Sequence, residues 1–233
     1  METLRVDIWS DIACPWCYVG KRHLEAALAR FAHRDHVEVT WHAFELDPSA
    51  PRVRDEATSY AERLAKKYGT PTARAEEMIR TMTETAARDG LDFRFDRIRP
   101  GNTFDAHRVI HLAHERGVQD AVKERLLRGY MTEGEAIGET EVLVRLGAQA
   151  GLAADEVAAV LASDDHAADV RADEAQAREL GINGVPYFVF GGTYAVSGAQ
   201  PAEVLLGALE RAWEESAGAS HAEGAVCGPE GCA

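Results

Sequence analysis

The sequence predicts an α/β protein in which strands from both ends of the chain form one sheet and a long helical segment is inserted between them. Residues 4–9 and 37–43 have the pattern of strands, and an amphipathic helix separates them. From about residue 47 to residue 180, only helical patterns follow. Strand character then returns at residues 187–190, before a pair of glycines and a final helix.

The amino-terminal part has the order strand, helix, strand. The first strand reads as buried and ends at Ser10-Asp11. A helix is expected from Cys14, because apolar residues recur at helical spacing as far as Phe31. Residues 37–43 then alternate apolar and polar side chains, which is the period of a strand. A helical crossover of this kind joins two parallel strands.

The inserted segment reads as a series of helices, several of which end at a glycine, the residue that commonly follows a helix end. The expected helices cover residues 55–68, 72–88, 103–116, 120–130, 140–150, 154–162 and 164–180. Asn102-Thr103 is expected to cap the third of them. We therefore predict an inserted helical domain, residues 47–180, between the two parts of one α/β domain, residues 1–46 and 181–215.

The carboxyl-terminal part predicts a hairpin and a closing helix. Gly191-Gly192 suits the positive backbone angles of a two-residue turn, so residues 193–197 are expected to run back as a strand. Pro201 fits the first turn of an amphipathic helix. After Ser216 the chain consists of Gly, Ala, Ser and charged residues, which predicts a flexible tail over residues 216–233.

Charge and hydropathy exclude several classes of partner. The formal net charge of −14 argues against nucleic acid and anionic membranes, which attract basic proteins. No apolar run reaches the length of a membrane-spanning helix, and the amino terminus lacks the basic start and apolar run of a secretory signal. We therefore expect a cytoplasmic protein.

The four cysteines form two close pairs, Cys14 with Cys17 and Cys227 with Cys232. Cytosolic proteins seldom keep structural disulfides, so close pairs indicate redox chemistry or metal binding. Cys14 and Cys17 lie three apart on one helical face, close enough for a disulfide. They also lie in the first helical turn, where unpaired N–H groups and the helix dipole stabilise a thiolate. Cys14, the more exposed sulfur, is expected to attack a substrate disulfide, and Cys17 to resolve the mixed disulfide.

A second feature, Val185-Pro186, directly precedes the strand at residues 187–190. The bond before a proline is the one that is readily cis, and a cis bond here would turn the backbone of Val185 outward toward an extended peptide. A trans proline that merely opens the strand is the alternative. Combined with the amino-terminal unit, the pattern favours cis. Trp16 either stacks on a substrate or shields the disulfide.

Together, the Cys-Pro-Trp-Cys helix, the flanking strands, the helical insertion, Gly-Val-Pro, the hairpin and the closing helix resemble DsbA-like thioredoxin-fold proteins. The nearest branch is the FrnE type, grouped with 2-hydroxychromene-2-carboxylate isomerases and kappa-class glutathione transferases. Residues 11–20 and 177–186 are the most specific parts. The resemblance implies a thioredoxin-like fold with a large inserted all-helical domain. It also implies Cys14 as nucleophile, Cys17 as resolving cysteine and Pro186 as a cis-proline facing the sulfurs.

The isomerase and transferase relatives typically have Ser at the nucleophile position and bind glutathione, whereas this chain keeps both cysteines. We therefore predict a thiol–disulfide oxidoreductase that acts on protein or peptide thiols and disulfides, or on glutathione and other small thiols. It needs no cofactor and no metal, because electrons pass between sulfurs. A glutathione-dependent isomerase or transferase, or a noncatalytic chaperone-like peptide binder, is the alternative. The predicted substrate-binding residues are Pro15, Trp16, Val185 and Pro186.

The second cysteine pair lies in a turn sequence that would bring Cys227 and Cys232 together. Our hypothesis is an auxiliary redox pair that exchanges electrons with the first pair; the alternative is an inert tail. Zinc binding by all four cysteines is disfavoured, since the pairs share no fold context. Three histidines, His107, His111 and His114, cluster on one side of the third expected helix. We interpret them as boundary histidines at the edge of the core, partly packed and partly in water, rather than as metal ligands.

Overall fold

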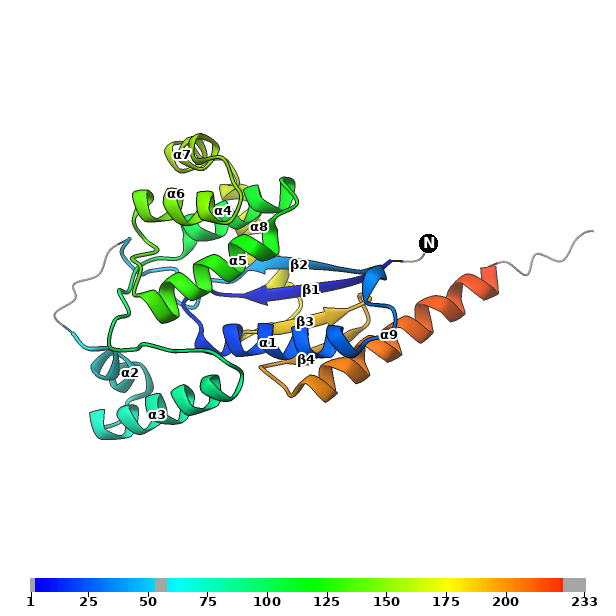
Figure 1. Cartoon of the computed structure of the whole chain (residues 1–233), viewed down its shortest axis with the longest axis horizontal. Helices are drawn as coiled ribbons and strands as arrows, with labels where there is room; N and C mark the ends of the chain where they lie inside the picture. The colour runs from blue at the N-terminus through cyan, green and yellow to red at the C-terminus, as the bar shows by residue number, and fades with distance from the viewer. Residues whose placement is uncertain (1–2, 53–57, 224–233) are drawn as a thin grey trace, which may run out of the picture.

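The computed structural model, which describes residues 3–52 and 58–223, contains a four-stranded sheet with helices on both faces (Figure 1). The strands are β1 (Leu4–Ser10), β2 (Val37–Ala43), β3 (Tyr187–Phe190) and β4 (Tyr194–Ser197). Their order in the sheet is β2-β1-β3-β4. β1 and β2 are parallel, as the crossover predicted, and the hairpin strand β3 runs antiparallel to both β1 and β4.

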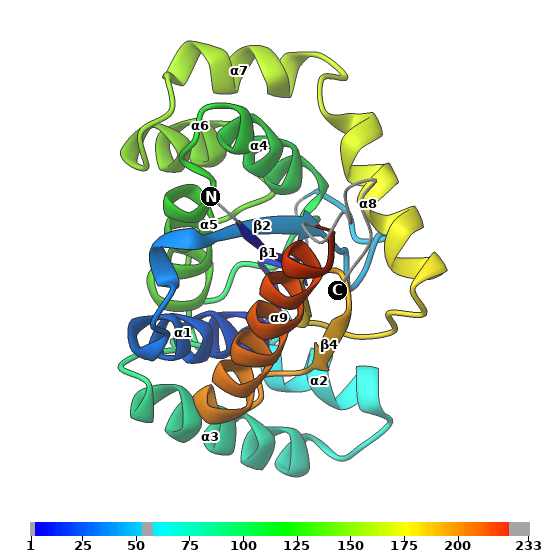
Figure 2. The same ribbon diagram turned by 90° about the vertical axis from the view of Figure 1, so that its right-hand side faces the viewer.

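Two helices that are far apart in sequence cover one face of the sheet. They are α1 (Pro15–Arg30) and α9 (Ala202–Glu223), which pack against each other, and α9 also contacts β1, β3 and β4. Figures 1 and 2 show both helices on the same side of the sheet. The two ends of the chain therefore build one α/β unit around β1.

The inserted helices separate into two groups on opposite sides of the sheet (Figures 1 and 2). α2 (Tyr60–Tyr68) and α3 (Thr72–Arg88) pack on each other and lie on the same side as α1. On the other side, three helices contact β2: α4 (Phe104–Glu115), α5 (Gln119–Arg128) and α8 (Ala167–Glu179). Farther from the sheet lie α6 (Thr140–Gln149) and α7 (Ala154–Ala162).

One apolar core joins the sheet to the helices of both groups. Ile8 and Trp41 of the sheet belong to it, together with Met82 of α3, Leu126 of α5 and Leu205 of α9. Because burying apolar side chains is the main favourable contribution to folding, the sheet and the insertion stabilise each other. The division of the chain at residues 46 and 181 stays a prediction.

Most expected elements are present, and the differences lie at their ends. Gly191 and Gly192 have φ angles of 59° and 71°, as the predicted hairpin turn requires. α2 begins at Tyr60 rather than near Asp55, because Ser59 and Glu62 form a reciprocal capping box there.

Two further ends differ from the prediction. α5 gives way at its end to a π-helical turn, Gly129–Glu133. α9 runs on to Glu223, so the prediction of a tail from residue 216 was wrong for residues 216–223. None of the helices in the described part of the chain combines the length and the apolar character needed to cross a lipid bilayer.

Candidate active site

The first cysteine pair lies where β1 passes into α1. Cys14 is the residue before the helix, with extended backbone angles, and Pro15 occupies the first helical position, where its missing N–H is not needed. The backbone N–H of Cys17 donates to the carbonyl of Cys14 at 3.1 Å. No acidic residue lies in the first turn of α1, so no carboxylate within that turn offsets the positive end of the helix dipole beside the cysteines.

The second predicted feature meets the first in space. The Val185–Pro186 bond is cis, as expected, and Pro186 is buried at the start of β3. The thiol of Cys14 donates a hydrogen bond to the carbonyl oxygen of Val185 at 3.5 Å. The fold therefore brings together Cys14, Cys17, Val185 and Pro186. The contact between Cys14 and Val185 joins residues that are 171 positions apart in the sequence.

The two cysteines are free thiols that differ little in exposure. Cys14 is 4% exposed and Cys17 is fully buried, so Cys14 is the more accessible of the two, as predicted, but only narrowly. Trp16, between them in sequence, is 45% exposed. Only a small part of Cys14 is therefore open to an incoming sulfur.

The environment of Cys17 favours the protonated thiol. Burial, a hydrogen bond with Cys14 and the negative charge on Cys14 raise the pKa of Cys17 well above its ordinary value. The charge of Lys123 opposes this effect. Because only a thiolate attacks a disulfide, Cys17 stays unreactive at neutral pH until a group nearby takes its proton.

Beneath the cysteines lies a cluster of buried ionisable groups that the sequence reasoning missed. Asp11 and His107 are each 1% exposed, and Lys123 is fully buried. Asp11 Oδ1 lies 3.5 Å from His107 Nε2, and Asp11 Oδ2 accepts the backbone N–H of Leu46 at 2.8 Å. Lys123 Nζ donates to the carbonyl of Ser10 at 3.3 Å.

A sequence signal for Lys123 does exist. In α5 the buried residues are Gln119, Val122, Lys123, Leu126 and Leu127, spaced as one helical face. A lysine on a mostly apolar face predicts a buried cation, and burying a cation costs free energy. Asp11 gives no such signal, since it ends a strand and could equally face solvent.

A second buried cluster ties the helices to the sheet. His42 of β2 lies between two carboxylates: its Nδ1 is 2.8 Å from Asp173 Oδ1 and its Nε2 is 2.9 Å from Asp7 Oδ1. His111 Nε2 lies 2.9 Å from Asp173 Oδ2. Burial favours the neutral imidazole, but the hydrogen bonds and charges of Asp173 and Asp7 prevail and raise the pKa of His42 to about 9.

The three histidines of α4 do not converge. His107 is buried beside Asp11, His111 is half-buried beside Asp173, and His114 is exposed. The interpretation of all three as boundary histidines is therefore wrong for His107. No group of three or more His, Cys, Asp or Glu side chains suited to a metal ion occurs among residues 3–52 and 58–223. Cys227 and Cys232 lie outside the described residues.

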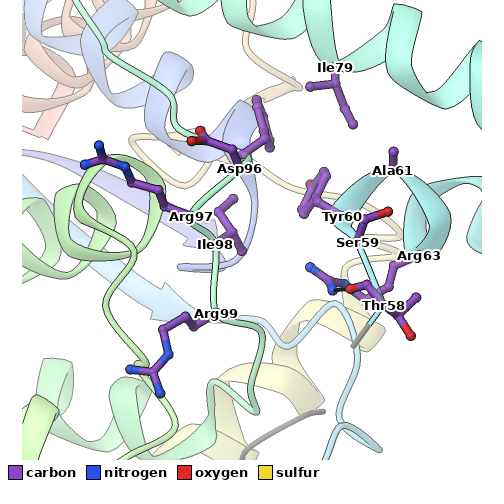
Figure 3. Close-up of a pocket in the computed structure, with 11 residues that line it drawn as sticks. Thr58, Ser59, Tyr60, Ala61, Arg63, Ile79, Asp96, Arg97, Ile98 and Arg99 are labelled. Atoms are coloured by element: carbon purple, nitrogen blue, oxygen red, sulfur yellow. Dashed lines mark hydrogen bonds between the residues drawn. The ribbon is translucent and has the colours of Figure 1, made fainter. Parts of the chain in front are cut away.

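A cavity of about 370 Å³ opens between α2, α3 and the segment that precedes α4. The residues that line it are 58–61, Arg63, Ile79 and 95–99, and Figure 3 shows the Tyr60 side chain among them. The guanidinium of Arg63 lies 5.6 Å from the centre of the Tyr60 ring. Burial and then the charge of the Cys14 thiolate raise the pKa of Tyr60.

Comparison with known proteins gives one family and a consistent set of folds. The family model described as DSBA-like thioredoxin domain matches residues 5–210. The chain is similar to the crystal structure of a probable DsbA oxidoreductase from Streptomyces coelicolor, with 44% identity and a TM-score of 0.84 over 99% of this chain and 98% of that one.

Two more distant structures share the fold. A 2-hydroxychromene-2-carboxylate isomerase is 15% identical, with a TM-score of 0.64 over 92% of this chain and 98% of that one. The cytosolic disulfide reductase DsbM from Pseudomonas aeruginosa, in a structure with GSH, is 17% identical, with a TM-score of 0.58 over 93% and 99%. The predicted resemblance and the predicted thioredoxin-like fold with a helical insertion are confirmed by these matches.

Proposed function

Because the chain belongs to the DSBA-like thioredoxin domain family, we propose that it is a thiol–disulfide oxidoreductase that works through Cys14 and Cys17. One observation carries the proposal: the Cys14 thiol at the start of α1 contacts the carbonyl of Val185, next to the cis bond to Pro186. In this arrangement a substrate at Cys14 would also meet the main chain of Val185, which leads into β3.

In the proposed reaction the Cys14 thiolate attacks one sulfur of a substrate disulfide. A bond forms between Cys14 and that sulfur, and the other substrate sulfur leaves as a thiolate. Cys17 then loses its proton and attacks Cys14 Sγ, which releases the second substrate thiolate and leaves a Cys14–Cys17 disulfide. Two electrons pass from the cysteine pair to the substrate, and the reverse sequence oxidises a substrate dithiol.

The surroundings of the pair support this division of roles. Cys14 sits at the helix end, where unpaired N–H groups stabilise a negative charge, and it is the more exposed sulfur. Cys17 lies one turn deeper, and its raised pKa keeps it protonated while Cys14 reacts. Pro15 and Trp16 form the outer edge of the site, where the exposed indole offers an apolar surface to a peptide.

We include two kinds of substrate in the proposal. Protein or peptide disulfides would lie along Val185, whose backbone precedes the strand β3. Glutathione and other small thiols would enter the cavity of Figure 3, with a carboxylate on Arg63. The presence of GSH in the DsbM structure, which shares this fold, is in keeping with the second kind.

Insulin reduction tests the proposal directly. The wild-type protein should reduce insulin in the presence of a small thiol, whereas Cys14→Ser and Cys17→Ser should each abolish the activity. Cys17→Ala should accumulate mixed disulfides through Cys14, which mass spectrometry detects. Insulin reduction that survives in Cys14→Ser would refute the proposal. Isomerisation of a chromene substrate that survives in Cys17→Ser would instead favour the glutathione-dependent isomerase.

The proposal also covers the second cysteine pair and the cellular compartment of the protein. We propose that Cys227 and Cys232 relay electrons to or from the first pair, and that the protein works in the cytoplasm. Replacing both tail cysteines by Ser should slow turnover with at least one reductant. Unchanged turnover with every reductant would leave the tail without a redox role. Cell fractionation tests the compartment.

A further inference from the structure

Asp173 of α8 accepts hydrogen bonds from three other elements of the fold. Its Oδ1 accepts from His42 Nδ1 of β2 at 2.8 Å, and its Oδ2 accepts from the backbone N–H of Ala43 at 2.7 Å. Oδ2 also accepts from His111 Nε2 of α4 at 2.9 Å. The main-chain carbonyl of Asp173 accepts the indole N–H of Trp9 of β1 at 3.1 Å. One residue, itself 7% exposed, therefore fastens α8 to β1, β2 and α4.

The side chain of Asp173 is a carboxylate in the folded protein. Burial favours its neutral form, but the hydrogen bonds from His111 and His42 and the charge of His42 prevail and hold the pKa of Asp173 below its ordinary value. Hydrogen bonds to an ionised group are the strong ones in proteins. The helix α8 is therefore held firmly at this point, on the face of the sheet opposite α1.

The segment that carries Val185 begins where α8 ends. Residues 180–186 lead from α8 to β3 without regular secondary structure. Gly181 has a φ angle of 70°, in the region that favours glycine. The segment is tied back to the helix by the backbone N–H of Ile182, which donates to the carbonyl of Ala177 at 2.8 Å. The place of Val185 therefore depends on its two anchors, α8 on one side and β3 on the other.

A small apolar cluster connects Asp173 to the active site. Its buried members are Trp9, Ala177 and Ile182. Val185 packs against this cluster, and the indole of Trp9 is the group that donates to Asp173. The carbonyl of Val185 in turn accepts the thiol of Cys14 at 3.5 Å. A continuous series of contacts thus runs from the carboxylate on α8 to the nucleophilic sulfur.

We propose that Asp173 is a positioning residue that holds the main chain of Val185 where a peptide substrate binds it. This inference rests on the proposed function, in which a peptide disulfide lies along Val185 while Cys14 attacks it. Asp173 acts through α8 and the apolar cluster rather than on the reacting atoms. It should therefore matter for substrates that reach the main chain of Val185, and not for a small disulfide that needs only Cys14 and Cys17.

Two substrates separate this role from a loss of stability. Asp173→Ala should raise the KM for insulin by roughly tenfold, the order expected when one main-chain hydrogen bond to the substrate is lost, and should change kcat by less than about twofold. The rate with hydroxyethyl disulfide, which is small and uncharged, should stay at the wild-type level. Unfolding of part of the sample would lower both activities together. Asp173→Asn keeps an oxygen that accepts the Ala43 N–H, so it should recover most of the loss.

Three further variants complete the experiment. Asp169→Ala removes a carboxylate one turn earlier on α8, where the side chain is 57% exposed, and should change neither substrate. Val157→Ala makes a cavity in α7, which packs on α4 and α6, and should lower stability without changing the KM for insulin. If Asp173→Ala does not fold, His111→Ala carries the test. It removes one of the bonds at a half-buried position, so the KM for insulin should rise by roughly two- to threefold.

The two proposals can fail separately. An unchanged KM for insulin in Asp173→Ala, an equal loss with both substrates, or the same rise in Val157→Ala would refute the positioning role and leave the oxidoreductase function intact. If the wild-type protein reduces neither insulin nor hydroxyethyl disulfide, the oxidoreductase function fails and this inference fails with it.

Discussion

Gly20 of α1 lies directly against Pro186, the residue of the cis bond. A Cβ atom at position 20 would stand 2.8 Å from Pro186 Cγ and 3.2 Å from the ring of Phe188. The first distance is one that real Cβ atoms essentially never show. The absence of a side chain at Gly20 therefore lets the helix that carries the cysteines approach the strand that carries the cis proline.

Replacing Gly20 by Ala should lower the free energy of unfolding by about 1–3 kcal/mol, because the added methyl group overpacks this contact. Urea denaturation measures the change. Gly207→Ala is the matched control: it also lies in a helix, but nothing stands within 4 Å of the new Cβ. That variant should gain up to about 1 kcal/mol through helix propensity. If Gly20→Ala were as stable as wild type, Pro186 and Phe188 would be able to move away from the new methyl group without loss of stability.

His42 should make stability depend on pH on the alkaline side. Its folded-state pKa of about 9 lies above the ordinary 6.5, so its contribution is complete below pH 6.5 and is lost as the pH rises through about 9. The loss should amount to roughly 1–3 kcal/mol. Urea denaturation across this range measures it. His42→Gln should flatten the dependence and His114→Gln, at an exposed position, should not. An equal slope in His42→Gln would contradict the prediction.

Trp16 should act on substrate affinity rather than on folding. It is 45% exposed beside the cysteines, so Trp16→Ala should raise the KM for insulin by roughly fivefold and leave the free energy of unfolding nearly unchanged. Steady-state kinetics and urea denaturation together measure both. Val204→Ala, 46% exposed on α9, provides a control of equal exposure that should change neither. A lower stability with an unchanged KM would assign Trp16 to shielding the disulfide.

Arg63 should distinguish small thiols from protein substrates. Arg63→Gln removes the cation beside Tyr60, so the KM for glutathione should rise by roughly two- to fivefold, which corresponds to the loss of a solvent-accessible ion pair. Insulin reduction driven by an uncharged dithiol should keep its rate. Arg34→Gln, on the turn before β2, serves as the control. If glutathione and insulin kinetics changed equally, Arg63 would have a structural role rather than a role in binding small thiols.

Local patterns were sufficient to predict the parts of the site that lie within single elements. The spacing of Cys14 and Cys17, the position of Pro15 and the turn at Gly191-Gly192 are all properties of short stretches, and each was found where expected. The cis bond at Pro186 was favoured only by combining two distant stretches. The choice between a cis and a trans bond was therefore made from the combined pattern of the family, because the local sequence favoured neither.

The buried charges could not be predicted in this way, because their partners come from different elements. Asp11 meets His107 across the gap between β1 and α4, and no spacing rule connects those positions. Asp173 of α8 reaches His42 of β2 across 131 positions. Burial itself also depends on packing: Cys14 was expected to be accessible from its place at a helix end, yet neighbouring side chains cover most of it.

The acceptor for the Cys14 thiol is a main-chain carbonyl, a group that every amino acid possesses. Evolution can therefore exchange the residue at position 185 for another and keep this bond, while altering the side chain that an incoming molecule meets. Reactivity and selectivity are in this way assigned to different atoms of one residue. Saturation mutagenesis at that single codon offers a route to altered partner preference at constant chemistry.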